Sequence, residues 1–439
     1  MSSAAEMHEP RETPGGRAIG LADRLVRHRG LILVAAAGIA VRLVLLPTVG
    51  VRDDTDLFAG WVHGLAVGRL GEAYRLELTF PPVMAYILWL VSLIQPAFQT
   101  ATNAADAAVR IALKAPASLA DLGLAAGVWW YLRTKPGWAT VGAAAILLHP
   151  AVIDVSAWWG QFESIYVFAG LAAFLLAAAG RPRMAAVALG LALMTKPQAL
   201  TFVIPFAAWY VGRHGWRETA ICGAIGVATI AVVWLPFLAD GGVGRYLNTL
   251  EHLQNVDFSV LSLRAWNPWW ILQSGAGGDF LSDRGALLGP LSPRTIGLAL
   301  FGLLEAGIFV AVLRRPDSRT LAIGLAASVM AAFITLTTMH ERYAYGAIVF
   351  LALLLPERRP RWLWAALSVA FTANLLAAIP PPPLLGVIPI GGPVGLLGSV
   401  TMVAVAIGCL TSLAQAVRRP AGDSSLVVTP ARVARRGSG

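Results

Sequence analysis

The sequence predicts an all-α polytopic membrane protein. Hydrophobic residues make up 57% of its 439 residues and charged residues only 13%, a balance typical of chains that cross a membrane several times. Apolar runs recur along the chain, and most arginines lie in the short gaps between them. The net charge of +10 is therefore attributed to arginines that set membrane orientation. Nucleic acid is not an expected partner.

The two ends of the chain differ from the rest. Residues 1–30 and 416–439 are polar and rich in small residues, which predicts mostly disordered cytoplasmic segments. Residues 31–415 are then one transmembrane domain. Its two cysteines, Cys222 and Cys409, lie inside apolar runs. We expect packed, reduced thiols without a disulfide or metal framework.

The first apolar run, 31–47, is preceded by arginines at positions 24, 27 and 29, so the positive-inside bias places the N-terminus in the cytoplasm. The first outer loop, 48–110, follows. Within it, residues 56–74 predict an amphipathic helix on the outer surface. The run 81–94 is roughly 13 residues long where a crossing needs about 20, which favours a re-entrant helix. Counting it as a crossing would put every later arginine cluster outside.

The remaining apolar runs bring the expected number of transmembrane helices to about twelve, with both termini in the cytoplasm. A long outer loop is expected at 240–293. The runs 184–195 and 200–210 are too short to cross unaided, and they predict a hairpin whose turn places Lys196 at a helix break facing a polar cavity. The crossings after the first are expected at 111–132, 137–153, 162–179, 184–195, 200–210, 220–238, 296–313, 321–338, 344–355, 362–379 and 394–414.

Four polar groups converge on the outer side in this topology. Charged side chains near the membrane interior cost about 2.5–3.5 kcal/mol each, so they are expected to face a cavity. A cavity holding cations beside carboxylates suits an anionic substrate and a proton acceptor. The groups are Asp53, Asp54 and Asp56; Asp154 with Trp158, Trp159, Gln161 and Glu163; Lys196 with Gln198; and His340, Glu341, Arg342 and Tyr343.

Each group also has a structural explanation. The aspartates could belong to a solvated loop, and Lys196 could extend to the membrane interface. Trp158 and Trp159 could form an aromatic belt, and Glu341 could simply pair with Arg342. His149, beside a proline in an apolar run, is expected to be structural. The presence of all four groups on one face favours a functional site.

These motifs resemble the polytopic glycosyltransferases of superfamily C (GT-C), and within it the bacterial mannosyltransferase-like proteins. The resemblance covers roughly residues 42–345 and rests on five motifs in order. They are the acidic first outer loop, Phe80-Pro81-Pro82, Trp159-Gly160-Gln161-Phe162-Glu163, Thr195-Lys196-Pro197-Gln198 and His340-Glu341-Arg342-Tyr343. Asn267, in the tryptophan-rich segment 265–270, matches a further stretch. Glu163 departs from the family, in which aspartate is often found.

The resemblance implies that a hexose, with mannose favoured, moves from a polyprenyl-phosphate-sugar donor to a lipid, glycan or protein acceptor of the cell envelope. Transfer would occur on the extracytoplasmic face of the cell membrane with inversion at the anomeric carbon. Asp54 is the best match to the aspartate base, with Asp53 and Asp56 as alternatives. Lys196, Arg342 and His340 would bind the donor phosphate. The remaining substrate-binding candidates are Trp159, Gln161, Glu163, Gln198, Glu341, Tyr343 and Asn267.

Lysine and arginine alone can neutralise a lipid monophosphate, so we expect no cofactor and no required metal, although a divalent ion is left open. The alternative function is a lipid or sugar transporter or flippase, which would carry charged residues through the mid-membrane on both sides of a pathway. A catalytically inactive scaffold is a third class. The concentration of charge near the outer face favours the enzyme.

Overall fold

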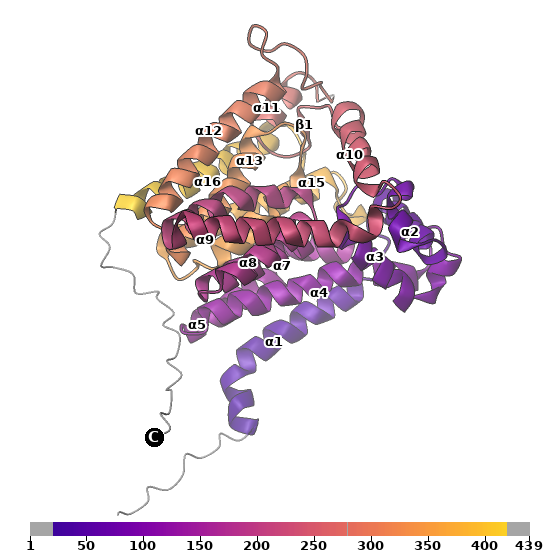
Figure 1. Cartoon of the computed structure of the whole chain (residues 1–439), viewed down its shortest axis with the longest axis horizontal. Helices are drawn as coiled ribbons and strands as arrows, with labels where there is room; N and C mark the ends of the chain where they lie inside the picture. The colour runs from indigo at the N-terminus through magenta and orange to yellow at the C-terminus, as the bar shows by residue number, and fades with distance from the viewer. Residues whose placement is uncertain (1–20, 279, 419–439) are drawn as a thin grey trace, which may run out of the picture.

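The computed structural model describes residues 21–278 and 280–418, and the expectations for residues 1–20 and 419–439 lie outside this part. Nearly all regular structure is helical (Figure 1). The α-helices are α1 (Leu21–Leu45), α2 (Arg52–Val67), α3 (Pro82–Ile94), α4 (Ala107–Leu132), α5 (Pro136–Leu147), α6 (Pro150–Ile153), α7 (Glu163–Ala178), α8 (Pro182–Leu193), α9 (Val203–Trp234), α10 (Gly242–His252), α11 (Pro268–Gly275), α12 (Pro293–Arg314), α13 (Ser318–Thr335), α14 (Tyr345–Ala352), α15 (Arg358–Ala378) and α16 (Gly392–Arg418).

Short 3₁₀ and π turns connect several of these helices, namely η1 (Leu70–Leu76), η2 (Pro96–Gln99), η3 (Asp154–Trp159), η4 (Pro197–Phe202), η5 (Leu235–Phe237), η6 (Leu253–Asp257), η7 (Glu341–Ala344) and η8 (Pro382–Leu384). Two strands of two residues each, β1 (Ser262–Leu263) and β2 (Met339–His340), pair in parallel. This pair joins the long loop after α10 to the segment that follows α13. No pattern in the sequence indicated this pairing.

Six helices of the described part are long and apolar enough to cross a membrane, or seven if a bent pair counts as one span. They are Ala107–Leu132, Pro197–Phe237, Pro293–Arg314, Ser318–Thr335, Arg358–Ala378 and Gly392–Arg418. Large apolar side chains on their surface, such as Leu303 at 69% exposure and Leu397 at 69%, suit contact with lipid. The chain is an all-α membrane protein, and the count of twelve crossings stays a prediction.

Three expected elements differ from the observed ones. Helix α1 begins at Leu21, so residues 21–30, which were expected to belong to a disordered arm, are helical. The expected crossing 137–153 bends by 46° between Leu147 and Pro150, where the His149 side chain accepts the Ala151 N–H and caps the new helix. Helix α14 has only 8 residues, all buried. It spans about 12 Å and is a core helix.

Two expected helix breaks are confirmed. Lys196 is in extended conformation between α8 and η4, as expected for the turn of a short hairpin. Gly215 lies in the expected gap between the crossings 200–210 and 220–238. It has φ 77° and interrupts α9. A residue with a side chain rarely adopts this left-handed conformation. The glycine thus allows the kink that divides α9 into two helices.

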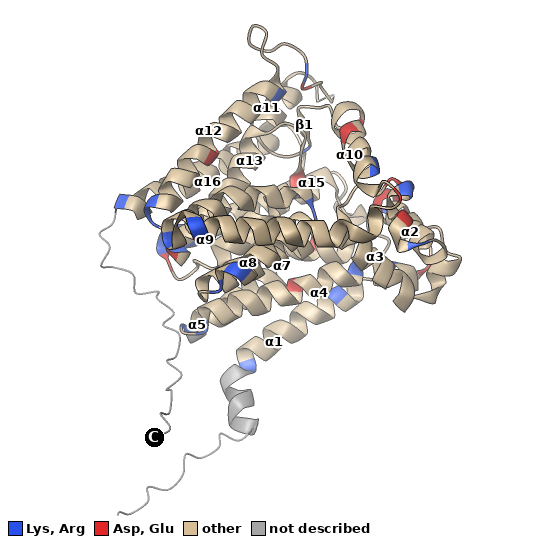
Figure 2. Cartoon of the chain, in the orientation of Figure 1, with Lys and Arg blue, Asp and Glu red and all other residues tan. Residues whose placement is uncertain are grey.

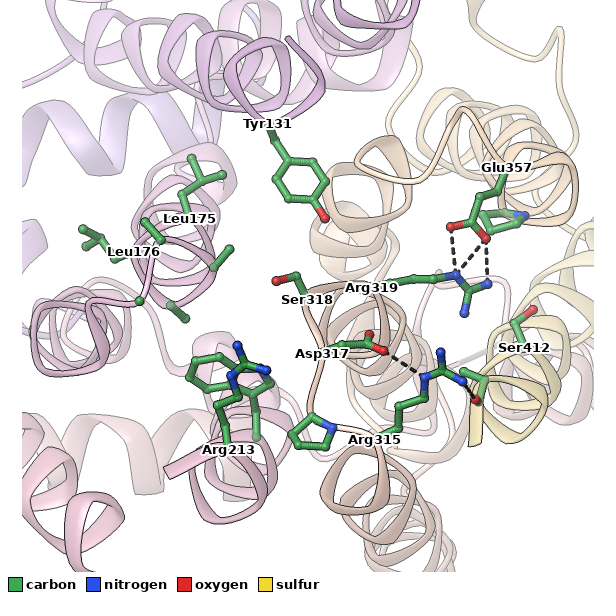
Figure 3. A pocket seen from close by; sticks show the side chains of 18 of the residues that line it. Tyr131, Leu175, Leu176, Arg213, Arg315, Asp317, Ser318, Arg319, Glu357 and Ser412 are labelled. Atoms are coloured by element: carbon green, nitrogen blue, oxygen red, sulfur yellow. Dashed lines mark hydrogen bonds and ion pairs between the residues drawn. The ribbon is translucent and has the colours of Figure 1, made fainter. Parts of the chain in front are cut away.

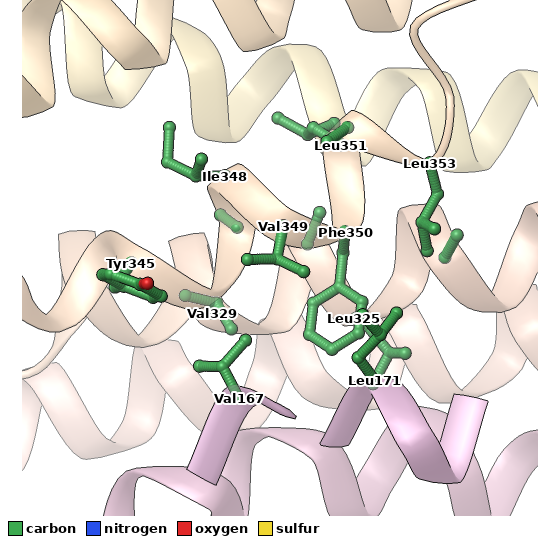
Figure 4. Close-up of a cluster of buried hydrophobic side chains, with 14 of the residues drawn as sticks. Val167, Leu171, Leu325, Val329, Tyr345, Ile348, Val349, Phe350, Leu351 and Leu353 are labelled. Atoms are coloured by element: carbon green, nitrogen blue, oxygen red, sulfur yellow. The ribbon is translucent and has the colours of Figure 1, made fainter. Parts of the chain in front are cut away.

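Helices α7, α13 and α14 form the centre of the core. Val167 and Leu171 of α7 lie against Leu325 of α13 and Phe350 of α14 (Figure 4). All four side chains are at most 1% exposed. Helix α7 starts, and α13 ends, at the end of the bundle where the predicted site residues lie. This packing therefore fixes the positions of both Glu163 and the segment after α13.

Charged residues gather at the two ends of the bundle (Figure 2). Lysines and arginines cluster at the end where α5, α8 and the middle of α9 lie, whereas the α2 and α10 end carries both signs of charge. The ribbon between them is mostly uncharged, as expected for a segment in contact with lipid.

Candidate active site

Asp54 lies in the first turn of α2 and is held by two donors from a distant part of the chain. Its Oδ2 accepts hydrogen bonds from Trp159 Nε1 at 2.7 Å and Gln161 Nε2 at 2.7 Å. Among the described residues, no hydrogen bond reaches its Oδ1. The carboxylate is thus fixed in orientation with one oxygen left to accept a proton from a bound molecule.

Gly160 allows Trp159 and Gln161 to approach Asp54 together. The π-turn η3 ends at Gly160 with φ 95°, and Gln161 N then donates to Val155 O at 2.9 Å. A Cβ on this glycine would lie 2.9 Å from Cγ of Lys114. The Lys114 ammonium in turn donates to Thr48 O at 2.8 Å and Trp158 O at 2.6 Å. These bonds hold the start of the first outer loop against the turn.

Glu163 joins two cations that are far apart in the sequence. Its Oε1 accepts from Lys196 Nζ and, at 3.1 Å, from Nε of Arg342. Lys196 is 4% exposed and Glu163 is fully buried. Ion pairs at this depth require partners on both sides because an unpaired buried charge is costly. The three side chains therefore hold α7, the α8–η4 break and the segment after α13 together.

Arg342 connects the Glu163 cluster to the Asp54 group. Its guanidinium carbon lies 4.8 Å from the centroid of the Trp159 ring, and Trp159 is the donor to Asp54. Nη1 donates to Glu341 Oε1 at 2.9 Å. Nη2 makes no hydrogen bond within the described residues. Two charge-assisted N–H donors of Arg342 are therefore open to an anionic ligand.

His340 lies beside Arg342 as a neutral ring. Burial, with the positive charges of Arg342 and Lys196, holds the pKa of His340 well below its ordinary value. Its Nδ1 lies 3.1 Å from Arg342 Nη1 and accepts from it, because the guanidinium has only donors. His340 thus supplies an Nε2–H donor and no positive charge. Burial raises the pKa of Glu341, an effect that Arg342 opposes.

Three buried acceptors in this region have no partner among the described residues: Glu163 Oε2, Gln198 Oε1 and Asp154 Oδ2. A buried acceptor without a partner costs about 1–3 kcal/mol. Such a group of acceptors suits a ligand that brings several O–H donors.

Three predicted site residues lie outside this cluster. Asp53 is exposed on α2, and Asp56 Oδ1 accepts the Ala104 N–H at 2.8 Å, which ties α2 to the loop before α4. Asn267 is fully buried, caps α11 through Trp270 N at 2.9 Å and donates to Phe333 O at 3.1 Å. Its amide thus makes one donated and one accepted structural bond away from the cluster, and its expected substrate contact stays a prediction.

The structure distinguishes functional from purely structural explanations for Trp159, Lys196 and Glu341. Trp159 is 2% exposed and bonded to Asp54, so the aromatic belt is wrong for it. Lys196 points to Glu163 and does not extend to the interface. Glu341 pairs with Arg342, as the structural explanation predicted. Arg342 also bonds Glu163. The Phe80-Pro81-Pro82 motif also lies here, since Lys196 Nζ is 5.6 Å from the Phe80 ring centroid.

Sequence analysis missed a buried network behind the site. Asp121 of α4 accepts from Arg42 of α1 at 2.8 Å, from Ser156 and from Tyr345 Oη at 2.9 Å. Tyr345 follows the His340-Glu341-Arg342-Tyr343 motif by two residues. The network therefore anchors that motif and the η3 turn to α1 and α4. The signals in the sequence that could have indicated this network were Arg42 and Asp121, two charged residues inside apolar runs.

No group of three or more His, Cys, Asp or Glu residues in the described part of the chain is arranged to hold a metal ion. No family model matches the chain, and no curated protein matches it. The fold and the site define a helical membrane protein with a buried carboxylate–cation cluster at one end of its bundle.

Proposed function

We propose that this protein is an integral membrane glycosyltransferase of the GT-C type. It transfers a hexose, with mannose favoured, from a polyprenyl-phosphate-sugar donor to an acceptor hydroxyl of the cell envelope on the extracytoplasmic face. The observation that carries the proposal is the position of Asp54. Its carboxylate is oriented by Trp159 and Gln161, and Trp159 stacks on Arg342 of the adjacent cation cluster. A base and a phosphate-binding group thus share one site.

In the proposed reaction, Asp54 Oδ1 removes the proton of the acceptor hydroxyl as its oxygen attacks the anomeric carbon. The bond from that carbon to the phosphate oxygen breaks, and polyprenyl phosphate leaves. Attack from the face opposite the leaving group inverts the anomeric configuration. The proton stays on Asp54 until it is released to water.

The phosphate of the sugar donor would accept hydrogen bonds from the unused N–H groups of Lys196 and Arg342. An ammonium group has three N–H donors, of which Lys196 uses one for Glu163, and Arg342 retains Nη2. Charge-assisted bonds to the phosphate oxygens strengthen as the leaving group gains negative charge. Such bonds in a buried site contribute several kcal/mol to transition-state stabilisation.

The unpaired acceptors support a sugar as the transferred group. Glu163 Oε2 and Gln198 Oε1 lie on the side chains that contact the cations and Tyr343. A hexose offers several hydroxyl donors, and pairing them with buried acceptors removes the cost of leaving these oxygens unsatisfied. The longer side chain of Glu163, compared with aspartate in the family, is accommodated here because it reaches both Lys196 and Arg342.

A transporter or flippase is the second candidate, and two buried carboxylates away from the site bear on it. Asp121 is paired with Arg42, and Glu305 of α12 accepts from Ser328 of α13. Each contacts a neighbouring helix, and the two lie on separate helix pairs. Among the described residues, these two carboxylates therefore do not line two sides of one mid-membrane site, as a transporter would predict, and this favours the transferase.

The two functions are separated by following a radiolabelled polyprenyl-phosphate-mannose in proteoliposomes with a membrane lipid extract. The transferase predicts that label leaves the carrier and appears in a new product. The flippase predicts that the carrier stays intact while its label changes leaflet. An intact carrier with mannose, glucose and other polyprenyl-phosphate sugars would contradict the proposed function.

A further inference from the structure

A second polar region lies at the other end of the bundle. It is a cavity of about 1240 Å³ bounded by the ends of α4, α7, α12, α13, α15 and α16 and by the middle of α9 (Figure 3). Its volume is above the range of about 300–1,000 Å³ that is common for small-molecule sites. None of the candidate active-site residues lines it.

The cavity and the candidate active site occupy opposite ends of the same helices. Helix α7 begins at Glu163 and ends at the cavity wall near Ala178, while α13 begins there at Ser318 and runs towards His340. The 16 residues of α7 span about 24 Å. The short basic gaps at this end predict that it faces the cytoplasm.

The cavity is strongly basic. Eight of its lining residues are Lys or Arg and two are Asp or Glu. The two acids are already paired, because Asp317 accepts from Arg315 at 2.9 Å and Glu357 from Arg319 at 2.6 Å. Arg181 and Arg213 have no carboxylate partner within the described residues, and Figure 3 shows Arg213 without a bonded neighbour.

Buried polar groups with no partner also line the cavity. Trp209 is 3% exposed, and its Nε1–H donates to no described residue. Nε2 of His214 is likewise buried without a partner. A buried indole N–H normally has an acceptor. Trp209 and Arg213 lie four residues apart on α9 and both line the cavity, so an anion bound at Arg213 would lie next to this unused N–H donor.

The rest of the lining is apolar. Leu175 and Leu176 of α7 lie on one side of the cavity (Figure 3), and the neighbouring Ala177 also lines it. A free anion would gain nothing from this wall, whereas the first carbons of an acyl chain would bury apolar surface against it. The combination of basic residues with an apolar wall, at the end of the bundle expected to face the cytoplasm, is typical of sites for lipid headgroups.

We propose that this cavity binds the headgroup of an anionic phospholipid that carries more than one phosphate negative charge. Arg181 and Arg213 contact the phosphate oxygens, Trp209 Nε1 donates to one of them, and the α7 wall contacts the glycerol and upper acyl carbons. The excess of unpaired cations selects a multiply charged headgroup. This proposal stands independently of the proposed transferase activity.

The test is native mass spectrometry of the delipidated full-length protein titrated with cardiolipin, phosphatidylcholine or inorganic pyrophosphate. The variant Arg181→Gln/Arg213→Gln removes two unpaired cations. Arg217→Gln is the matched control, because Arg217 lies in the same basic gap and does not line the cavity. Trp209→Phe keeps the charge and removes only the N–H donor. Thermal unfolding without lipid verifies that each variant is folded.

We expect wild type to bind cardiolipin at least about tenfold more tightly than phosphatidylcholine, the double variant to lose about tenfold or more, and Arg217→Gln to change binding less than about twofold. Trp209→Phe weakens cardiolipin binding without a loss of charge. Equal binding of phosphatidylcholine, or an equal loss in Arg217→Gln, would overturn the proposal. If pyrophosphate bound as tightly as cardiolipin, the cavity would be assigned to a free phosphate compound, and the proposal of a lipid ligand would be overturned.

Discussion

Replacing Glu163 with glutamine is expected to destabilise the protein by isolating a buried cation. Glu163 is the carboxylate that Lys196 bonds among the described residues, whereas Arg342 keeps a second one, Glu341, at 2.9 Å. In Glu163→Gln the Lys196 ammonium therefore stays buried without an anionic partner. Removing one member of a buried ion pair costs about 3–5 kcal/mol.

The expected change in melting temperature follows from the size of the chain. With roughly 2.1 cal/mol/K per residue and 439 residues, the unfolding entropy is about 0.9 kcal/mol/K. A loss of about 3–5 kcal/mol then lowers Tm by about 3–5 °C. The double variant Glu163→Gln/Lys196→Met removes both charges and is expected to recover part of this loss, because no buried charge is left unpaired.

Thermal unfolding in detergent, followed by intrinsic fluorescence, measures these shifts. Glu218→Gln is the control, since Glu218 pairs at 2.8 Å with Arg183, whose side chain is 61% exposed, and such surface pairs contribute little. We expect no measurable shift in this control. The coupling between Glu163 and Lys196 would be refuted if Glu163→Gln melted at the wild-type temperature. It would also be refuted if the double variant melted below Glu163→Gln.

Two further predictions concern the geometry around Asp54 and Arg342. Gly160→Ala places a methyl group in a left-handed conformation 2.9 Å from Lys114 Cγ, which costs about 1–3 kcal/mol. It should lower both Tm and transfer activity, and an unchanged activity would contradict the role of this turn. The lowered pKa of His340 means that the unfolded chain binds more protons, so stability falls as pH drops below about 6.5. His340→Gln should reduce this acid sensitivity between pH 7.5 and 5.5 in thermal unfolding, and an identical pH slope would count against it.

Much of the site could be predicted from the sequence because its chemistry is carried by charged residues at the ends of apolar runs. The energetic cost of charge in a membrane forces such residues to face one another. Asp54, Glu163, Lys196 and Arg342 were grouped on this basis, and the structure brings them together. The helix break at Lys196 was predicted because the runs 184–195 and 200–210 are each too short to cross a membrane.

Other features depend on contacts that a single sequence does not reveal. That Asp54 and not Asp53 contacts the η3 turn depends on how α2 lies against this turn, where Lys114 bonds Thr48 O and Trp158 O. Asn267 is a residue type common in ligand sites, yet here its amide oxygen caps α11 and its amide nitrogen donates to Phe333 O. The short helix α14 has the hydropathy of a crossing, and its length of 8 residues and its complete burial show that it is a core helix.

The most direct test of the account is the rate of sugar transfer from polyprenyl-phosphate-mannose in Asp54→Asn, with Asp53→Asn as the matched control. Both substitutions remove one charge from the first turn of α2, and only Asp54 contacts Trp159 and Gln161. The account predicts a loss of about 10²–10⁴-fold in Asp54→Asn and near wild-type transfer in Asp53→Asn. Wild-type transfer by Asp54→Asn would contradict the assignment of Asp54 as the base.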